Sequence, residues 1–122
     1  MKGKRARILV GEGDPTLAMM YRSALRFAGF DVSAAANGVT ALWHIDQSPP
    51  DAVVLDLHLP GIRGEAILSE IVARPDLSHI PVIVVTGSDT QKVVAQANAI
   101  LRKPVDVSRL VSIVEQHLES AA

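Results

Sequence analysis

The stretch Ala52-Val53-Val54-Leu55-Asp56 joins four aliphatic residues to one carboxylate, and Leu57-His58-Leu59-Pro60-Gly61 follows it as a loop. A continuous apolar run of this length is typical of a strand that is buried on both faces. A carboxylate at the end of such a strand loses hydration, which costs several kcal/mol unless charge or hydrogen bonds compensate. Asp56 is therefore a candidate functional residue, and its role depends on which groups meet it there.

Short aliphatic runs alternate with helical patterns on both sides of this stretch. The other predicted strands span residues 7–11, 31–36, 81–86 and 99–101. The predicted helices span residues 15–28, 38–47, 64–73, 89–96 and 105–118. The first begins with Asp14 as N-cap and Pro15 at its first position. Five βα units predict an α/β domain whose parallel sheet carries helices on both faces, joined by right-handed crossovers.

Length, composition and charge limit the possible classes of protein. The chain has 122 residues, is 48% hydrophobic and 20% charged, and has a formal net charge of -1, which does not suit a strongly basic nucleic-acid binder. Its apolar runs are too short to span a bilayer. It has no cysteine, which excludes disulfides and thiolate metal sites and fits a cytoplasmic protein. We expect one domain over residues 1–122, with a basic lead-in at 1–6 and no output domain.

In an open parallel sheet, ligands bind in the crevice beyond the carboxyl ends of the strands. The residues expected there are Glu12, Gly13, Asp14, Asp56, Thr86, Gly87, Ser88, Lys103 and Pro104. Clustered carboxylates repel one another unless a cation shares the site. Lys103 together with a hard divalent ion such as Mg²⁺ would supply that positive charge. The sequence therefore predicts a pocket for an anionic group that is bound together with a metal ion.

A dinucleotide-binding loop is the alternative for the glycine-rich segment after the first strand. Gly11-Glu12-Gly13-Asp14-Pro15-Thr16 has threonine at the third glycine position of that fingerprint. The acidic residue expected at the end of the second strand is replaced by the Ala36-Asn37 region. The chain also has no G-x-x-x-x-G-K-[ST] phosphate loop. We therefore do not predict a nucleotide-binding site.

Five motifs together resemble one known family over nearly the whole chain. They are residues 8–15, Asn37-Gly38 with Ala41-Leu42, residues 51–60 around Asp56, residues 81–86, and Lys103-Pro104. The chain resembles the receiver domain of two-component response regulators, the CheY-like family that includes the chemotaxis response regulator. The resemblance implies a flavodoxin-like (βα)5 three-layer sandwich, a five-stranded parallel sheet of order 2-1-3-4-5, and a cis Lys103-Pro104 bond.

The same resemblance implies a function in phosphorelay signalling. Asp56 would accept a phosphoryl group from a phosphohistidine on a sensor histidine kinase or a histidine phosphotransfer protein. Glu12, Asp56 and the backbone carbonyl of His58 would hold Mg²⁺, while Thr86 would hydrogen-bond the phosphoryl group and Lys103 would pair with it. Such a domain is not an enzyme beyond self-catalysed phosphotransfer and autodephosphorylation. Its phosphorylation would change a surface that a downstream protein or output domain reads.

Three features depart from the family pattern. The second of two adjacent acids that usually follow the first strand, a direct Mg²⁺ ligand, aligns with Gly13. Asp14 lies one position further and is a tentative metal ligand, although capping the first helix is its favoured role. Ile100 stands where the family commonly has an aromatic switch residue, and the helix at 89–96 is shorter than usual by roughly one helical turn.

Two interpretations follow from this pattern. The first is a working receiver that is phosphorylated on Asp56, and the second is a pseudo-receiver that acts as a phosphorylation-independent interaction or homodimerisation module. Asp56, Thr86 and Lys103 are all retained, which favours the first. We further expect Tyr21 and Trp43 to pack on helix faces without a functional role, and the His58 side chain to face solvent.

Overall fold

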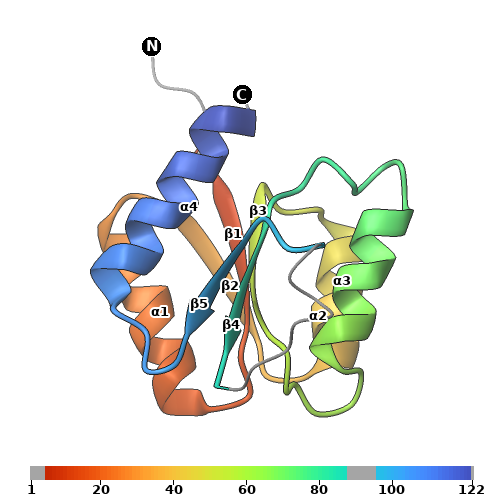
Figure 1. Cartoon of the computed structure of the whole chain (residues 1–122), viewed down its shortest axis with the longest axis horizontal. Helices are drawn as coiled ribbons and strands as arrows, with labels where there is room; N and C mark the ends of the chain where they lie inside the picture. Colours follow the sequence, from red (N-terminus) through yellow and green to blue (C-terminus); the bar gives the residue numbers. More distant parts are fainter. Residues whose placement is uncertain (1–4, 88–95, 122) are drawn as a thin grey trace.

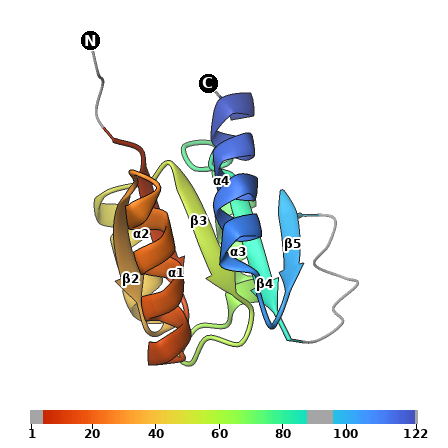
Figure 2. The same cartoon turned by 90° about the vertical axis from the view of Figure 1, so that its left-hand side faces the viewer.

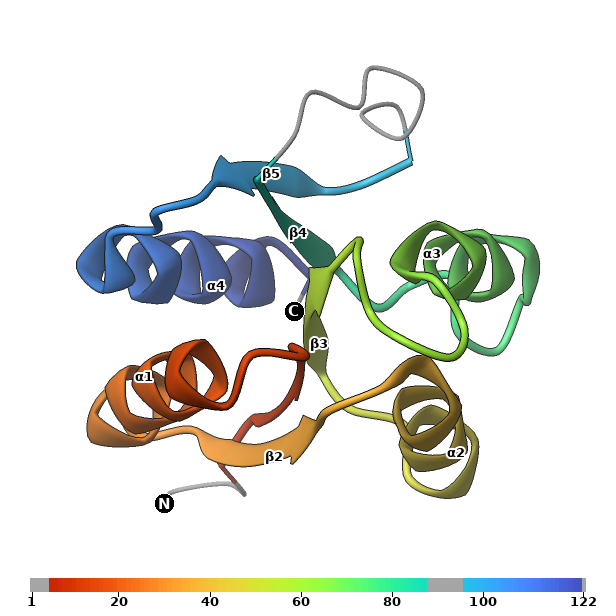
Figure 3. The same ribbon diagram turned by 90° about the horizontal axis from the view of Figure 1, so that it is seen from below.

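The computed structural model describes residues 5–87 and 96–121 of the chain. In chain order its elements are β1 (Arg7–Gly11), α1 (Pro15–Phe27), β2 (Asp31–Ala35), α2 (Gly38–Gln47), β3 (Ala52–Asp56), α3 (Gly64–Ala73), β4 (Val82–Thr86), β5 (Ala99–Arg102) and α4 (Val107–Ala121). Helices α1 and α4 cover one face of the sheet and α2 and α3 cover the other, so the described residues form three layers (Figures 1 and 3).

The five strands are all parallel and lie in the order β2-β1-β3-β4-β5. This order confirms the flavodoxin-like topology that the sequence resemblance implies. The chain leaves β1 toward β2 on one side and returns beside β1 as β3 on the other, which places a topological switch point between β1 and β3. Figure 2 looks onto the sheet face that α1 and α4 cover.

The apolar runs of the central strands are buried as expected. Every residue of β3 and β4 is buried, and their aliphatic side chains divide between two hydrophobic clusters, one on each face of the sheet. Along β1, Leu9 belongs to the cluster beneath α2 and α3, whereas Ile8 and Val10 belong to the cluster beneath α1 and α4. Period-two alternation within a strand produces this division.

Three strand boundaries differ from the prediction by one residue each. The strand predicted at 81–86 begins at Val82, because proline has no N–H to donate; the Pro81 carbonyl still accepts a hydrogen bond from Val53 N at 3.0 Å. The strand predicted at 99–101 extends to Arg102, which pairs in register with Thr86. The strand predicted at 31–36 ends one residue earlier, at Ala35.

The last helix begins at Val107, two residues later than the sequence pattern suggests. Asp106 caps it, because its Oδ1 accepts hydrogen bonds from the backbone N–H groups of Ser108 at 2.9 Å and Arg109 at 3.4 Å. The helix predicted at 89–96 lies outside the described residues except for Gln96, which is in a turn. None of the helices within 5–87 and 96–121 has the length and apolarity that a bilayer crossing needs.

The two large aromatic residues with a predicted packing role behave differently. Tyr21 is 1% exposed and belongs to the cluster beneath α1 and α4, as expected for a packing residue. Trp43 is 58% exposed, so its prediction as a packing residue was wrong. The inner face of α2 is instead formed by small and aliphatic side chains, because Ala41 and Ile45 take the buried positions.

Candidate functional site

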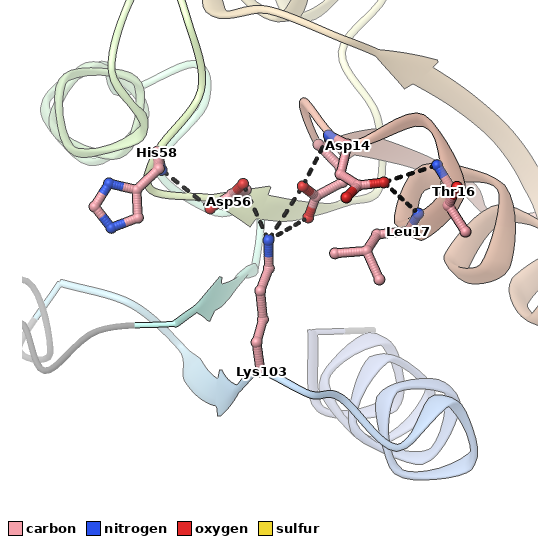
Figure 4. Close-up of polar contacts among 7 residues, drawn as sticks. Asp14, Thr16, Leu17, Asp56, His58 and Lys103 are labelled. Carbon is pink, nitrogen blue, oxygen red and sulfur yellow. Dashed lines mark hydrogen bonds and ion pairs between the residues drawn. The ribbon is translucent and has the colours of Figure 1, made fainter.

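One ammonium group bridges two buried carboxylates at the carboxyl end of the sheet. Lys103 Nζ lies 3.1 Å from both side-chain oxygens of Glu12 and 3.2 Å from Asp56 Oδ2. Glu12 is 2% exposed and Asp56 is 5% exposed. Figure 4 shows the Lys103 side chain extending from the end of β5 toward Asp56, and the same nitrogen also contacts Glu12. Lys103 is therefore the charged partner of Asp56, the buried carboxylate at the end of β3.

Strand alternation brings these three residues to the same side of the sheet. The apolar residues two positions before them, Val10, Val54 and Leu101, all belong to the cluster beneath α1 and α4. Because side chains on a strand alternate with a period of two, Glu12, Asp56 and Lys103 continue the same three columns beyond the hydrophobic cluster. The charged site is therefore the polar end of an otherwise apolar layer.

Burial and charge shift the pKa values of two site residues. Burial raises the pKa of Glu12, and the neighbouring Asp56 raises it further, while Lys103 opposes the rise. For Lys103, burial lowers the pKa, but hydrogen bonds and charge from Glu12 and Asp56 outweigh burial and leave the pKa raised. The ammonium is therefore held in its charged form, and the carboxylates share it.

The loop after β3 fixes the orientation of Asp56. The backbone N–H of His58 donates a hydrogen bond to Asp56 Oδ1 at 3.0 Å, so the two carboxylate oxygens have different partners. The loop is tied down by hydrogen bonds from Gly64 N to Leu57 O at 3.1 Å and from Gly38 N to Pro60 O. The His58 side chain is exposed and points away from Asp56, as the sequence predicts (Figure 4).

Asp14 caps the first helix. Its Oδ1 accepts hydrogen bonds from the backbone N–H groups of Thr16 at 2.8 Å and Leu17 at 3.2 Å, which confirms the predicted capping role. The Asp14 backbone N–H also donates to Glu12 Oε2 at 3.2 Å. The start of α1 thus holds the Glu12 carboxylate in place, while the Asp14 side chain is exposed and engaged at the helix terminus.

Thr86 and Lys103 are linked through the backbone. Thr86 is 2% exposed and ends β4, and its carbonyl accepts a hydrogen bond from the Lys103 N–H at 2.9 Å. The Lys103-Pro104 bond is cis, as the family resemblance implies. Ile100, the residue at the usual aromatic position, is half-buried and packs against the cluster beneath α2 and α3. The structure thus brings Glu12, Asp56, Thr86 and Lys103 to one edge of the sheet.

Gly13 supplies no side-chain oxygen beside Glu12. No group of three metal-ligating side chains exists in the part of the chain that the structure describes. Glu12 Oε1 is buried and accepts no aligned hydrogen bond from a described residue, although Lys103 Nζ lies 3.1 Å away. The carboxylates of Glu12 and Asp56 offer oxygen ligands of the kind that a hard cation such as Mg²⁺ prefers. Magnesium retains several water ligands, so it needs few ligands from the protein. The residues therefore fit magnesium, with fewer protein ligands than the family pattern provides.

A parallel sheet of order 2-1-3-4-5 with a lysine and two carboxylates at its carboxyl edge defines a receiver-type domain. The chain belongs to the response regulator receiver domain family, which it matches over residues 8–115. This membership assigns the chain to two-component signalling.

Curated relatives support the assignment. The chain is 36% identical to protein Rrf1 of Nitratidesulfovibrio vulgaris over 118 residues, which cover 96% of this chain and 86% of Rrf1. It is 37% identical to the DNA-binding response regulator MtrA of Mycobacterium tuberculosis, with 97% of this chain covered. The match covers 53% of MtrA, so the chain spans about half the length of that relative.

Solved structures show the same architecture. The signal receiver domain of a signal transduction histidine kinase from Syntrophus aciditrophicus has a TM-score of 0.86 at 28% identity, with 94% of this chain and 91% of that chain covered. A CheY-like response regulator receiver domain protein from Methanospirillum hungatei has a TM-score of 0.89 at 23% identity, with 97% of both chains covered. At that identity the second likeness supports the fold alone.

The sequence identified Glu12, Asp56, Thr86 and Lys103 as neighbours, because each lies at the carboxyl end of a predicted strand or just beyond it. It did not identify Tyr21 as a residue close to the site. The helical spacing of α1 does indicate that Tyr21 faces the sheet. It packs in the same cluster as Val10, the residue two positions before Glu12. No residue pattern marks the hydroxyl itself as different from that of any packing tyrosine.

Proposed function

We propose that the protein is a phosphorylatable receiver in which Asp56 accepts a phosphoryl group from a histidine kinase or a histidine phosphotransfer protein. The observation that carries this proposal is Lys103 Nζ placed 3.2 Å from Asp56 Oδ2 in a buried site. A charged lysine directed at a buried carboxylate can stabilise both that carboxylate and the phosphoryl group attached to it. A lysine retained only for packing would not need this position.

The chemistry assigns a separate task to each residue. An oxygen of Asp56 attacks phosphorus as the P–N bond of the phosphohistidine breaks and the imidazole leaves. Lys103 then pairs with the negative charge of the phosphoryl oxygens, and the Thr86 hydroxyl hydrogen-bonds one of them. Glu12, Asp56 and the backbone carbonyl of His58 would hold Mg²⁺. When bound, the ion neutralises charge on the phosphoryl group during transfer.

Phosphorylation would change a surface of this domain that a protein partner recognises. It would not prepare the domain to act on a small-molecule substrate. Conversion of Asp56 to an acyl phosphate adds negative charge beside Lys103, which biases the domain between two states that a downstream protein or output domain distinguishes. The name of the relative MtrA describes a DNA-binding response regulator, but this chain aligns with about half of that protein. For this chain we propose contact with protein partners, not with DNA.

Incubation with Mg²⁺ and a small phosphoryl donor such as phosphoramidate tests the proposal. We expect intact-mass analysis to show one added phosphoryl group on the wild-type protein and none on Asp56→Asn. Amide spectra should change around residues 56–59 and 86–87 only when Asp56 is present. A wild-type protein that gains no phosphoryl group at millimolar Mg²⁺ would favour the pseudo-receiver instead.

Gly13→Asp is expected to tighten Mg²⁺ binding by about tenfold or more, because it restores a carboxylate beside Glu12 and Asp56. A Cβ atom on Gly13 would lie 3.2 Å from Pro60 Cδ and 3.6 Å from the Ala36 carbonyl oxygen. The closer neighbour is the edge of a proline ring, which can move by a few tenths of an ångström. Amide chemical-shift titration with MgCl₂ measures the dissociation constant.

Gly13→Asn is the matched control, since asparagine has nearly the same shape without the charge. Both variants should lose a similar, small amount of stability, but only the aspartate variant should bind Mg²⁺ more tightly than the wild type. Equal affinities of Gly13→Asp and Gly13→Asn would show that residue 13 does not face the metal.

A further inference from the structure

Tyr21 belongs to the hydrophobic cluster beneath α1 and α4, whose columns of side chains end at the charged site. It lies on α1 in the cluster that contains Val10, Val85 and Leu101, the apolar residues just before the site on three strands. Val85 is also in register with Asp56. A side chain on a helix leans toward the helix N-terminus, and the N-terminus of α1 follows Glu12 by three residues. We therefore expect the tyrosine side chain to lean toward the carboxyl edge of the sheet, where Glu12 lies.

The hydroxyl of Tyr21 has no partner among the described residues. The side chain is 1% exposed, and its oxygen is buried without a hydrogen bond. An unpaired buried hydroxyl is costly, and phenylalanine would fill the same space without that cost. Burial raises the pKa of Tyr21, and the charge of Glu12 is the next largest cause of the rise. The hydroxyl thus lies within electrostatic reach of Glu12.

Glu12 Oε1 is the other buried polar atom that accepts no aligned hydrogen bond from the described residues. A buried hydroxyl that lacks an acceptor therefore lies within electrostatic reach of a buried carboxylate oxygen whose neighbouring donor, the Lys103 ammonium at 3.1 Å, is not aligned with it. An ordered water molecule between them would satisfy both groups, since a buried water typically makes several hydrogen bonds to such atoms.

We propose that Tyr21 is a positioning residue, whose hydroxyl orients the Glu12 carboxylate for Mg²⁺ through a hydrogen bond, directly or through one water molecule. This inference rests on the proposed function, because it takes Glu12 as a magnesium ligand. Carboxylates that bind metals are themselves held by hydrogen bonds, and these outer partners affect metal affinity by about 10- to 100-fold. With glycine at position 13, the orientation of Glu12 matters more than in a site with two adjacent acids.

Tyr21→Phe tests the proposal because it removes only the hydroxyl. We expect the variant to bind Mg²⁺ about tenfold more weakly than the wild type in an amide chemical-shift titration. Its melting temperature without metal should stay close to that of the wild type, since the packing of the ring is retained and only one hydrogen bond is lost. A hydroxyl that served only the fold would give the opposite pattern, with lower stability and unchanged affinity.

A second measurement reads the contact itself without metal. The chain has one tyrosine, so incorporation of 3-fluorotyrosine gives a single ¹⁹F resonance beside the hydroxyl. Glu12→Gln should shift this resonance in the metal-free protein, whereas Asp31→Asn, which changes an exposed carboxylate at the start of β2, should leave it in place.

The outcomes separate this inference from the proposed function. Weaker Mg²⁺ binding by Tyr21→Phe at unchanged stability, with a ¹⁹F shift in Glu12→Gln, supports it. Equal Mg²⁺ affinities of Tyr21→Phe and the wild type would overturn the positioning role and leave the magnesium site intact. A wild-type protein that binds no Mg²⁺ would overturn both the site and the role of Tyr21.

Discussion

Lys103→Met is expected to lower the free energy of unfolding by about 3 kcal/mol at neutral pH without metal, because it leaves two buried carboxylates without their shared cation. Lys103 Nζ is 3.1 Å from Glu12 and 3.2 Å from Asp56, and the two acids are 2% and 5% exposed. The ammonium group is partly exposed, which places the loss at the lower end of the range for buried ion pairs. Urea denaturation measures the difference.

The loss should depend on pH in a defined direction. The pKa of Glu12 is already raised in the folded protein, and Lys103 is the group that opposes the rise. Without Lys103 the pKa of Glu12 rises further. A carboxyl group with a raised pKa favours the folded state in its protonated form, so this stability is fully present below the ordinary pKa of 4.5 and is lost as pH rises through the folded value. The gap between Lys103→Met and the wild type should therefore widen as the pH rises through the raised pKa that Glu12 has in the folded wild type.

Two variants control for the charge. Lys103→Arg keeps the cation and should lose less stability than Lys103→Met at neutral pH. Adding Asp56→Asn to Lys103→Met should recover much of the loss, because one carboxylate remains in place of two. A loss that is the same at pH 4 and pH 7 would mean that packing of the lysine stem, and not charge, stabilises the site.

The sequence predicts much of this site, because the fold places strand ends together. The apolar run of β3 marked Asp56, and the carboxyl ends of the first, fourth and fifth predicted strands supplied Glu12, Thr86 and Lys103 as candidates. Parallel pairing brings the carboxyl ends of the strands to one edge of the sheet, so residues at these ends lie close together in space. The order of the strands, by contrast, came from the family resemblance, because strand composition alone does not fix which strand lies beside which.

Features that depend on local geometry were harder to predict. The start of α4 is decided by the Asp106 cap, a sequence signal that the apolar spacing of the helix obscured. Trp43 is a large aromatic residue of the kind expected in a core, but it lies on the outer face of α2. Ala41 and Ile45 already fill the inner face of that helix. The orientation of the Tyr21 hydroxyl depends on how a ring packs between a helix and three strands, which no residue pattern specifies.

Gly38→Ala is expected to destabilise the protein by about 3 kcal/mol, although alanine favours helices more than glycine does. Gly38 is the first residue of α2, and a Cβ atom there would lie 2.6 Å from the carbonyl carbon of Ile62 and 2.7 Å from its Cβ, closer than real Cβ contacts. The gain in helix propensity is about 1 kcal/mol. Because the neighbour is backbone, no rotation of a side chain can relieve the overlap, and the clash outweighs that gain.

The displaced segment is the loop that carries His58, so the substitution should also affect Asp56. Gly38 N donates to Pro60 O at 2.8 Å, and the His58 N–H donates to Asp56 Oδ1 at 3.0 Å, so a shift of the loop would weaken both bonds. Gly87→Ala is the control, because a Cβ there would meet no described atom within 4 Å. Urea denaturation and amide spectra compare the two variants. A Gly38→Ala protein as stable as Gly87→Ala would show that the loop can move away from α2 at little cost, and that the amide of His58 does not fix the orientation of Asp56.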